Sequence, residues 1–442
     1  MRALNRYAAA CSLLAALATV SWLHAGAGDL DAAFDRYWKA KSPGDAARPA
    51  GEIVRVGAPF KDVFARLRHG RPYSRDVATG VVRGRRAAVP LDFTYSLDVP
   101  TTYDPARMYQ VRVQLHGGVL MREDSAPRGP GGIGRLAGAE QIYVLPAAWR
   151  DAPWWTDVQL ENLRVILDTV KRTYNVDENR VALAGISDGG TAVYYVAMRD
   201  ATPYSSFLTL NGAITVLRNP AIGAHGDLFP GNLRNKPFFV VNGGRDELYP
   251  PAVVEPYVEH LRRGGVSLTY LPQSEAGHDT SWWPEVKTSF EQFVHDQPRV
   301  ALPDRLTWET SDTRRSGRAH WLVIESLGAQ PGDNEWLDDL NVLVPKGREP
   351  ALLLFKHAPR SGRVDLLRTG NTVVARSHGV AEFTLLLSPE QFDLGQPVGV
   401  TTNGRVAFEG RVEPSVATLM KWAARDNDRT QLYGVELRIQ VR

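Results

Sequence analysis

Apolar residues occur along the chain either in short continuous runs or at the spacing of a helix. The alternation of these two patterns defines a central region. Between residues 91 and 298, short apolar runs alternate with longer segments in which apolar residues recur every three or four positions. The runs fit buried strands, and they occupy residues 109–115, 142–145, 181–184, 206–210, 238–241 and 267–271. Such alternation predicts an α/β domain with a mainly parallel sheet and helices on both faces.

The regions on either side have different patterns. Residues 28–90 contain amphipathic stretches and are expected to form a helical N-terminal extension, which could cover a domain edge, form a lid or simply pack. Residues 299–442 contain short strand-like runs separated by turns, with a hairpin signal at Asn403-Gly404 and one helix after Pro414. We expect a separate, mainly β domain there, for which a sandwich is one arrangement.

The first 27 residues have the pattern of a signal peptide. Arg2 and Arg6 precede an apolar stretch, and Ala25-Gly26-Ala27 resembles a cleavage site. An uncleaved anchor is the alternative, but the apolar stretch is shorter than the roughly 20 residues that a membrane-spanning helix needs. We therefore expect an exported protein, periplasmic or extracellular, with no stable membrane span.

Composition and charge exclude several classes of function. The single cysteine, Cys11, lies in the predicted signal peptide, so the mature protein would have no disulfide and no thiol nucleophile. Lys and Arg total 52 against 49 Asp and Glu, which argues against a nucleic-acid or polyanion partner. The sequence has neither closely spaced zinc ligands nor a phosphate-binding Gly-rich loop, so no metal or cofactor is expected.

A candidate nucleophile lies in the sequence Gly185-Ile186-Ser187-Asp188-Gly189. This Gly-x-Ser-x-Gly pattern alone is weak evidence, because a glycine-rich chain can contain it by chance. Its setting is more specific: the apolar run 181–184 leads directly into Gly185, and residues 191–198 fit a helix. A strand, a sharp turn and a helix form the nucleophile elbow that exposes a serine hydroxyl. A Gly-rich loop with a capping serine is the structural alternative.

A serine nucleophile needs a base to accept its proton and an acid to orient that base. Asp246 follows the predicted strand 238–241, and His278 follows the predicted strand 267–271. Both therefore occur in the chain order, serine then acid then histidine, that the elbow requires.

Other carboxylates and histidines compete for these two roles. Glu247 and Asp279 are nearby, but they are farther from the expected strand-end turn. His260 and His295 lie in helix-like stretches and are expected at the surface, whereas His225 could belong to a substrate loop.

Hydrolysis also requires donors for the oxyanion that forms in the transition state. The main-chain N–H of Asp188, directly after the nucleophile, is one expected donor. The second is expected from the loop after the strand 109–115, at Gly118 or its neighbour Gly117. We expect His116, which precedes these glycines, to orient the loop by hydrogen bonding rather than to transfer protons.

Tryptophan pairs suggest where a substrate pocket could lie. One pair is Trp154-Trp155, and the other, Trp282-Trp283, closely follows the candidate base. We hypothesise that Trp155, Trp282 and Trp283, together with His116, line the acyl or alcohol pocket. Packing in the core is an equally good interpretation of any single tryptophan.

Four segments of the central region resemble known enzymes. They are Leu97-Asp98-Val99-Pro100 with Tyr103-Asp104, Leu115-His116-Gly117-Gly118, Asp177-Glu178-Asn179-Arg180-Val181 and Gly185-Ile186-Ser187-Asp188-Gly189-Gly190. These segments resemble bacterial polyhydroxybutyrate-depolymerase-like and feruloyl-esterase-like carboxylesterases, and they are similar to prolyl-oligopeptidase-type and dienelactone hydrolases. Depolymerase-like members usually have a small residue where this chain has Asp188.

The resemblance covers residues 91–298 and implies an α/β-hydrolase fold, ester cleavage through an acyl-enzyme and no cofactor. The resemblance assigns the role of nucleophile to Ser187, of acid to Asp246 and of base to His278. It assigns the oxyanion loop to Gly117 and Gly118.

The expected function is therefore that of an exported carboxylic-ester hydrolase acting on a small-molecule or polymeric ester. A serine peptidase resembling prolyl oligopeptidases is the nearest alternative, although no propeller-like region precedes the central domain. An alternative of another class is a catalytically silent scaffold that presents its β domain to a ligand, yet no triad residue or oxyanion glycine is missing. The sequence leaves the acyl group, the alcohol and the oligomeric state open.

Overall fold

The computed structural model describes residues 28–88, 91–122, 136–224, 227–329, 342–343, 352–353 and 360–442. The predicted signal peptide, residues 1–27, lies outside the described residues, as does His225. The chain divides into two compact units, Met1–Pro72 with Glu413–Val435, and Tyr73–Val412 with Glu436–Arg442.

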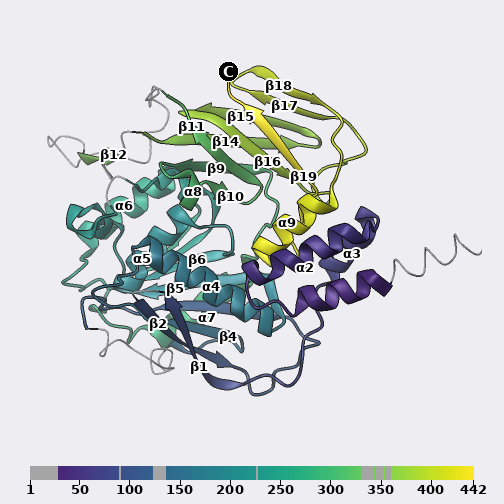
Figure 1. The fold of residues 1–442 in the computed structure, drawn as a ribbon. Coiled ribbons are helices and arrows are strands. Elements are labelled where there is room, and N and C mark those ends of the chain that lie inside the picture. The colour runs from purple at the N-terminus through teal and green to yellow at the C-terminus, as the bar shows by residue number, and fades with distance from the viewer. Residues whose placement is uncertain are drawn as a thin grey trace, which may run out of the picture. The chain divides into compact units, whose positions relative to one another are not determined.

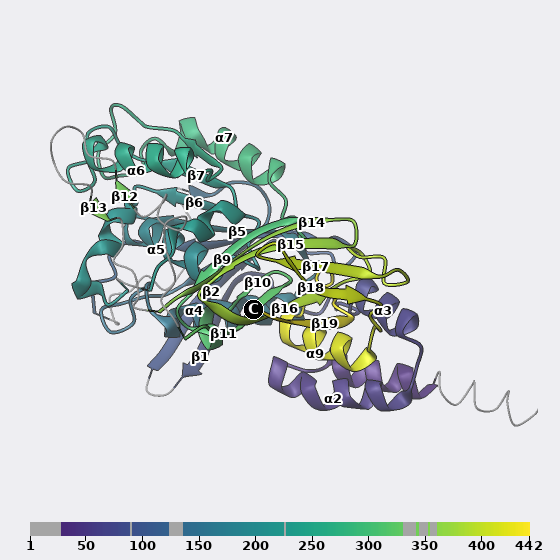
Figure 2. The same cartoon turned by 90° about the horizontal axis from the view of Figure 1, so that it is seen from above.

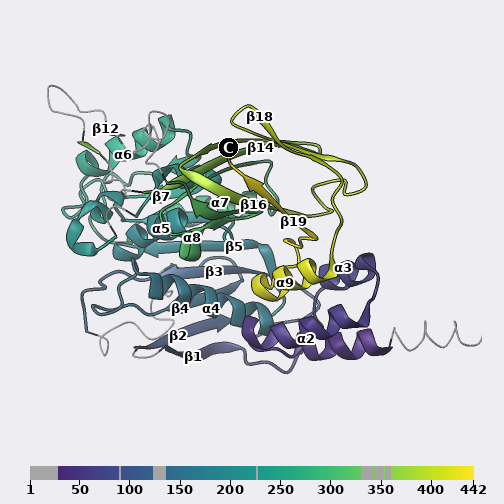
Figure 3. The same ribbon diagram turned by 45° about the horizontal axis from the view of Figure 1, so that its top comes forward.

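The first unit is a helical bundle made from two segments that are distant in the sequence. Its helices are residues 28–38, α2 (Pro43–Val56), α3 (Phe60–His69) and α9 (Val416–Asp426). Their apolar faces form one core that includes Phe34, Ile53, Val63, Leu67 and Leu419. Figure 3 shows α9 beside α2 and α3. The helix expected inside the C-terminal β domain therefore belongs to this bundle.

The second unit contains an eight-stranded sheet with the order β1-β2-β4-β3-β5-β6-β7-β8. The strands are β1 (Gly80–Ala88), β2 (Leu91–Val99), β3 (Tyr109–Leu115), β4 (Ile142–Pro146), β5 (Val176–Ile186), β6 (Ser206–Leu210), β7 (Phe238–Val241) and β8 (Leu268–Tyr270). β2 runs antiparallel to β1 and β4, and all other neighbours are parallel. The six predicted strands form the parallel part of the sheet. Residues 80–88, expected in the helical extension, instead form β1.

Helices cover both faces of this sheet, as predicted (Figure 1). They are α4 (Asp157–Thr173), α5 (Asp188–Arg199), α6 (Pro251–Arg263) and α7 (Trp283–Asp296), with the 3-10 turns η4 (Ile214–Arg218), η5 (Pro220–Ile222) and η6 (Pro230–Asn235). Successive strand residues point to opposite faces. Phe207 belongs to a ring stack that includes Tyr194 of α5, whereas Leu208 packs with Phe290 of α7. Accordingly, Figure 2 shows β6 and β7 between α5 and α7. None of the described helices is long and apolar enough to cross a membrane.

The C-terminal part of this unit consists mainly of strands, as the turn-separated runs predict. One sheet has the order β10-β11-β16-β19 and another β18-β17-β15-β14-β9, while β12 pairs with β13. These elements are β9 (Arg305–Thr310), α8 (Thr313–Ser316), β10 (Arg318–Ala319), β11 (Leu322–Leu327), β12 (Val342–Leu343), β13 (Leu352–Leu353), β14 (Gly362–Thr369), β15 (Thr372–His378), β16 (Val380–Leu387), β17 (Val398–Thr402), β18 (Arg405–Gly410) and β19 (Val435–Gln440). Asn403 and Gly404 have φ values of 51° and 78° and form the predicted hairpin between β17 and β18.

A buried amide side chain joins this β region to the α/β region. Nδ2 of Asn232 in η6 donates to the carbonyls of Met198 (2.8 Å) and Glu309 (2.9 Å). Its Oδ1 accepts the Glu309 N–H at 2.8 Å. Asn232 is fully buried, so removing its side chain would leave main-chain groups of both regions unbonded.

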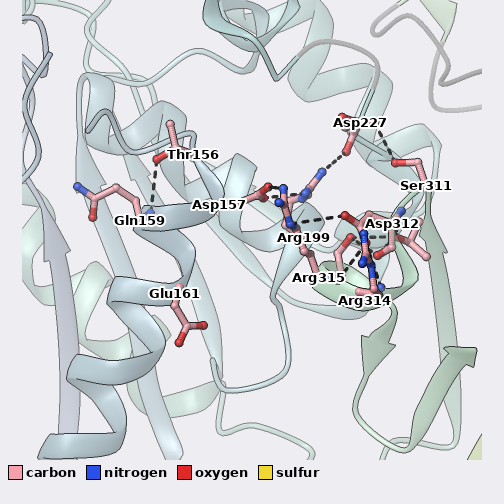
Figure 4. A network of polar contacts seen from close by, with 12 residues as sticks. Thr156, Asp157, Gln159, Glu161, Arg199, Asp227, Ser311, Asp312, Arg314 and Arg315 are labelled. Atoms are coloured by element: carbon pink, nitrogen blue, oxygen red, sulfur yellow. Dashed lines mark hydrogen bonds and ion pairs between the residues drawn. The ribbon is translucent and has the colours of Figure 1, made fainter. Parts of the chain in front are cut away.

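A second polar network joins the same two regions around a crevice of about 650 Å³ (Figure 4). Asp157, the first residue of α4, accepts a hydrogen bond from Arg199 at 2.9 Å and another from Arg315. Asp227 accepts one from Ser311 at 2.9 Å, and its carbonyl accepts one from Arg199 at 2.9 Å. We call these five residues the junction network.

Candidate active site

Ser187 lies in the sharp turn between β5 and α5. Its φ of 54° and ψ of −118° form a conformation that residues other than glycine rarely adopt, and such outliers gather at functional sites. The turn is held by hydrogen bonds of 2.9 Å from Ser187 N–H to the Leu210 carbonyl and from Thr191 N–H to the Ser187 carbonyl. Gly185 and Gly189 permit this geometry, because a Cβ on either would clash with main-chain atoms. The strand, turn and helix predicted around Ser187 are present.

Ser187, His278 and Asp246, which come from the ends of different strands, form a hydrogen-bonded chain. His278 Nε2 lies 2.9 Å from Ser187 Oγ, and His278 Nδ1 lies 2.7 Å from Asp246 Oδ2. Because an ionised carboxylate can only accept, Nδ1 carries the proton and Nε2 is free to accept the proton of the hydroxyl. The Asp246 side chain is completely buried, whereas that of His278 is 22% exposed. The structure thus brings the three residues together in the order that proton transfer needs.

Main-chain donors and an aromatic ring hold the acid and the base in place. Asp246 Oδ1 accepts hydrogen bonds from the N–H groups of Leu248 (2.9 Å) and Tyr249 (2.8 Å). The Tyr249 ring meets the His278 ring edge-on, with centroids 5.4 Å apart. Burial raises the pKa of Tyr249 to about 12, so its hydroxyl stays neutral near neutral pH.

The competing acids and bases have other surroundings. Glu247 is exposed, and Asp279 is exposed and bonded to Ser281, which holds the pKa of Asp279 below its ordinary value. His295 is exposed on α7, as expected. His260, which we also expected at the surface, is instead buried, because it lies on the face of α6 that packs inward.

The loop after β3, residues 116–119, is the candidate oxyanion loop, and His116 orients it. His116 Nε2 accepts the Ala148 N–H at 3.0 Å, so Nδ1 carries the proton and donates to the Gly117 carbonyl at 2.8 Å. Burial lowers the pKa of His116, which favours this neutral form. The His116 carbonyl also accepts a hydrogen bond from Trp154 Nε1 at 2.9 Å. His116 is therefore engaged on both ring nitrogens, and proton transfer to a substrate is not its role.

The oxyanion loop contacts the nucleophile and leaves donors available. A Cβ on Gly117 would lie 2.8 Å from Ser187 Cβ, so only glycine allows this approach. Within the described residues, the N–H groups of Gly118 and Asp188 donate no hydrogen bond. The Val119 N–H, in contrast, donates to Asp188 Oδ2 at 2.9 Å. The Gly117 N–H likewise donates no hydrogen bond within the described residues. The N–H groups of Gly117, Gly118 and Asp188 can therefore donate to an oxyanion.

The turn that holds Ser187 follows β5, the acid follows β7 and the histidine follows β8. Together with the strand order of the sheet, this is the serine, acid, histidine arrangement that the nucleophile elbow requires. The chain has the α/β-hydrolase fold. Among solved structures, it resembles a thermostable esterase at 18% identity and a TM-score of 0.41, over 50% of this chain and 63% of that one. It also resembles a ferulic acid esterase from Anaeromyces mucronatus at 17% identity and a TM-score of 0.38, over 54% of this chain and 96% of that one.

An acylaminoacyl peptidase from Pyrococcus horikoshii is a further solved structure that this chain resembles. It is 13% identical with a TM-score of 0.40, and the likeness covers 51% of this chain and 43% of the peptidase. This chain therefore spans less than two thirds of the thermostable esterase and of the peptidase. No protein-family model matches the sequence, and no curated protein matches it.

The tryptophans suggested for the substrate pocket lie in the core of the α/β-hydrolase region. Trp282 and Trp283 are 3% and 4% exposed and pack in one apolar cluster with Phe290. Trp283 Nε1 also donates to the Ala137 carbonyl at 3.3 Å. Trp155 is likewise buried. The large apolar area of these three residues is used in packing, which favours the core interpretation, and the pocket hypothesis stays a prediction.

Sequence reasoning missed Arg112, a fully buried cation in the middle of β3. Its Nη1 lies 2.9 Å from Glu291 Oε1 on α7, and its guanidinium lies 4.6 Å from the Tyr143 ring centroid. Burial lowers the pKa of Arg112. Arg112 thereby ties the strand that leads to the oxyanion loop to the helix that follows His278. The signal in the sequence is a single charged residue within a strand that is predicted to be buried.

Proposed function

We propose that this protein is a serine hydrolase that cleaves carboxylic esters through an acyl-enzyme on Ser187. The observation that carries the proposal is the simultaneous contact of His278 with Ser187 Oγ (2.9 Å) and with Asp246 (2.7 Å). Main-chain N–H groups that donate no hydrogen bond, those of Gly118 and Asp188 among them, supply the second requirement for acyl transfer. Ester substrates are preferred over amides on the sequence motifs that resemble carboxylesterases.

In the acylation step, Ser187 Oγ attacks the carbonyl carbon while His278 Nε2 takes the hydroxyl proton. The Asp246 carboxylate, bonded to Nδ1, stabilises the imidazolium that forms. Negative charge develops on the former carbonyl oxygen, where the N–H groups of Gly118 and Asp188 can donate to it. The tetrahedral intermediate then expels the alkoxide, which leaves as an alcohol with the proton from His278.

In the deacylation step, water replaces the alcohol. His278 Nε2 takes a proton from the water as its oxygen attacks the acyl carbon, and a second tetrahedral intermediate forms with the same two donors. Its collapse breaks the bond to Ser187 Oγ, which recovers the proton from His278. The products of the cycle are one carboxylic acid and one alcohol.

The decisive experiment measures hydrolysis of p-nitrophenyl esters of increasing chain length, feruloyl esters and peptide amides. The enzymes compared are wild type, Ser187→Ala, and Ser311→Ala as a matched control in the junction network. We expect Ser187→Ala to lower kcat by about 10⁴-fold or more. Ser311→Ala should keep wild-type kcat. A fluorophosphonate probe should label wild type at Ser187, as located by peptide mass spectrometry.

The other possible results point to specific alternatives. Retention of activity in Ser187→Ala would refute the mechanism. A folded wild type that neither reacts with the probe nor hydrolyses any substrate would favour the binding scaffold. Faster cleavage of peptide amides than of esters would favour the peptidase.

A further inference from the structure

Asp188 places a carboxylate immediately after the nucleophile. It is the first residue of α5, and its side chain reaches the oxyanion loop, where Oδ2 accepts the Val119 N–H at 2.9 Å. This hydrogen bond connects the elbow to a loop that comes from a different part of the chain. A carboxylate acceptor makes such a bond stronger than a neutral acceptor would.

The bond holds one of two successive peptide units around Gly118. In the first unit, the Gly117 carbonyl accepts a hydrogen bond from His116 Nδ1. Because the peptide is planar and trans, the Gly118 N–H points in the direction opposite to the Gly117 carbonyl, and therefore away from His116. In the second unit, the Val119 N–H points to Asp188. The Gly118 N–H therefore belongs to a peptide unit whose carbonyl is held by His116, and the next unit is held by Asp188.

We infer that the Asp188 side chain is a positioning residue for the oxyanion donors, an inference that rests on the proposed function. Asp188 then contributes twice. Its own N–H is one donor, and its carboxylate holds the loop that supplies the other donor from Gly118. Without the side-chain bond, the distance between the two donors is no longer fixed. Preorganised donors act on the transition state, so their loosening lowers kcat rather than weakening substrate binding.

Two substitutions separate the hydrogen bond from the negative charge. Asp188→Asn and Asp188→Ala both remove the charge at the N-terminus of α5, but only Asn keeps an oxygen that can accept the Val119 N–H. We expect Asp188→Ala to lower kcat about 10- to 100-fold, less than the 10²–10³ typical of deleting a donor. Asp188→Asn should lose about three-fold, because a neutral acceptor bonds more weakly.

The measurement that distinguishes positioning from simple destabilisation is the affinity for a transition-state analogue. A trifluoromethyl ketone adds to Ser187 and places an oxyanion at the donors. Its affinity should fall in Asp188→Ala by the same factor as kcat/KM, with KM unchanged. Asp157→Asn is the matched control: it removes a charge at the N-terminus of α4 and should change neither quantity. Melting temperatures report whether each variant is folded.

Equal kcat losses in Asp188→Asn and Asp188→Ala would overturn the inference, because the charge and not the hydrogen bond would then matter. Full activity of Asp188→Ala would overturn it as well. Failure of the proposed function has a different signature: wild type would form no adduct with the ketone, and Ser187→Ala would keep its activity.

Discussion

The candidate active site and the junction network are both polar clusters at the N-terminus of a helix. They differ in whether hydrogen-bonding groups remain unused. At the start of α4, the Asp157 carboxylate is bonded to the guanidinium groups of Arg199 and Arg315. At the start of α5, the Ser187 hydroxyl faces a base, and main-chain donors remain unused beside it. Polar groups that satisfy one another stabilise a fold, whereas spare donors at fixed positions can act on a substrate. The two clusters should therefore respond to substitution in opposite ways.

Among the substitutions that test this comparison, Gly117→Ala in the oxyanion loop should have the largest effect, which is on activity. The new Cβ would lie 2.8 Å from Ser187 Cβ, so the loop or the nucleophile must move. A displacement on the order of 1 Å at a reacting group lowers kcat by about 100-fold. Gly231→Ala in η6 is the control, because its Cβ would lie 3.7 Å from the nearest atom, an ordinary contact distance. Equal kcat values for the two variants would show that the loop does not need this close approach.

An intermediate effect is expected on stability alone, from Asp157→Ala in the junction network. Arg199, whose side chain is 7% exposed, would lose the acceptor of one N–H group. An unsatisfied buried donor costs about 1–3 kcal/mol, which a urea titration would detect as a lower midpoint. Arg315→Ala should cost less, under about 1 kcal/mol, because that side chain is 64% exposed. A fall in kcat for Asp157→Ala would remove the contrast between the two clusters.

The smallest expected effect is on the pH dependence of the melting temperature, and it arises from His116 in the oxyanion loop. Burial lowers the pKa of His116, so in the folded protein the ring resists protonation more than in the unfolded chain. Stability from this group is therefore present above the unfolded pKa of about 6.5 and is lost as pH falls below it. The melting temperature should fall less between pH 7.5 and 5 in His116→Gln than in wild type.

Wild type and His116→Gln must be compared with each other, because burial also lowers the pKa of His320. His320 therefore lowers the stability of both proteins as pH falls. Identical pH dependence of the melting temperature in wild type and His116→Gln would exclude a contribution from His116.

The parts of the molecule that follow from local patterns were predictable. Buried parallel strands are continuous apolar runs, so the strand before Gly185 and those before Asp246 and His278 were visible in the sequence. Once the strand order was assumed, the positions of the acid and the base followed from the chain order. The hairpin at Asn403-Gly404 was likewise encoded locally, because both residues favour the backbone conformation that this turn requires.

The parts that depend on distant partners were not predictable. The edge strand β1 contains three arginines and two glycines and alternates between half-buried and exposed positions, so it does not resemble a buried strand. The Trp282-Trp283 pair is as compatible with a pocket as with a core until α7 is seen packed on the sheet. The role of the Asp188 side chain depends on Val119, which only the folded loop brings near.

The helical bundle has a consequence for the order in which the chain folds during translation. Its core joins α2 and α3 to α9, yet the whole α/β region is synthesised between them. The early helices therefore lack the apolar face of α9 until Val435 has been synthesised, while the α/β region can already assemble. Chains released before Glu413 would expose the part of this core that α9 covers, which makes them targets for chaperones and proteases.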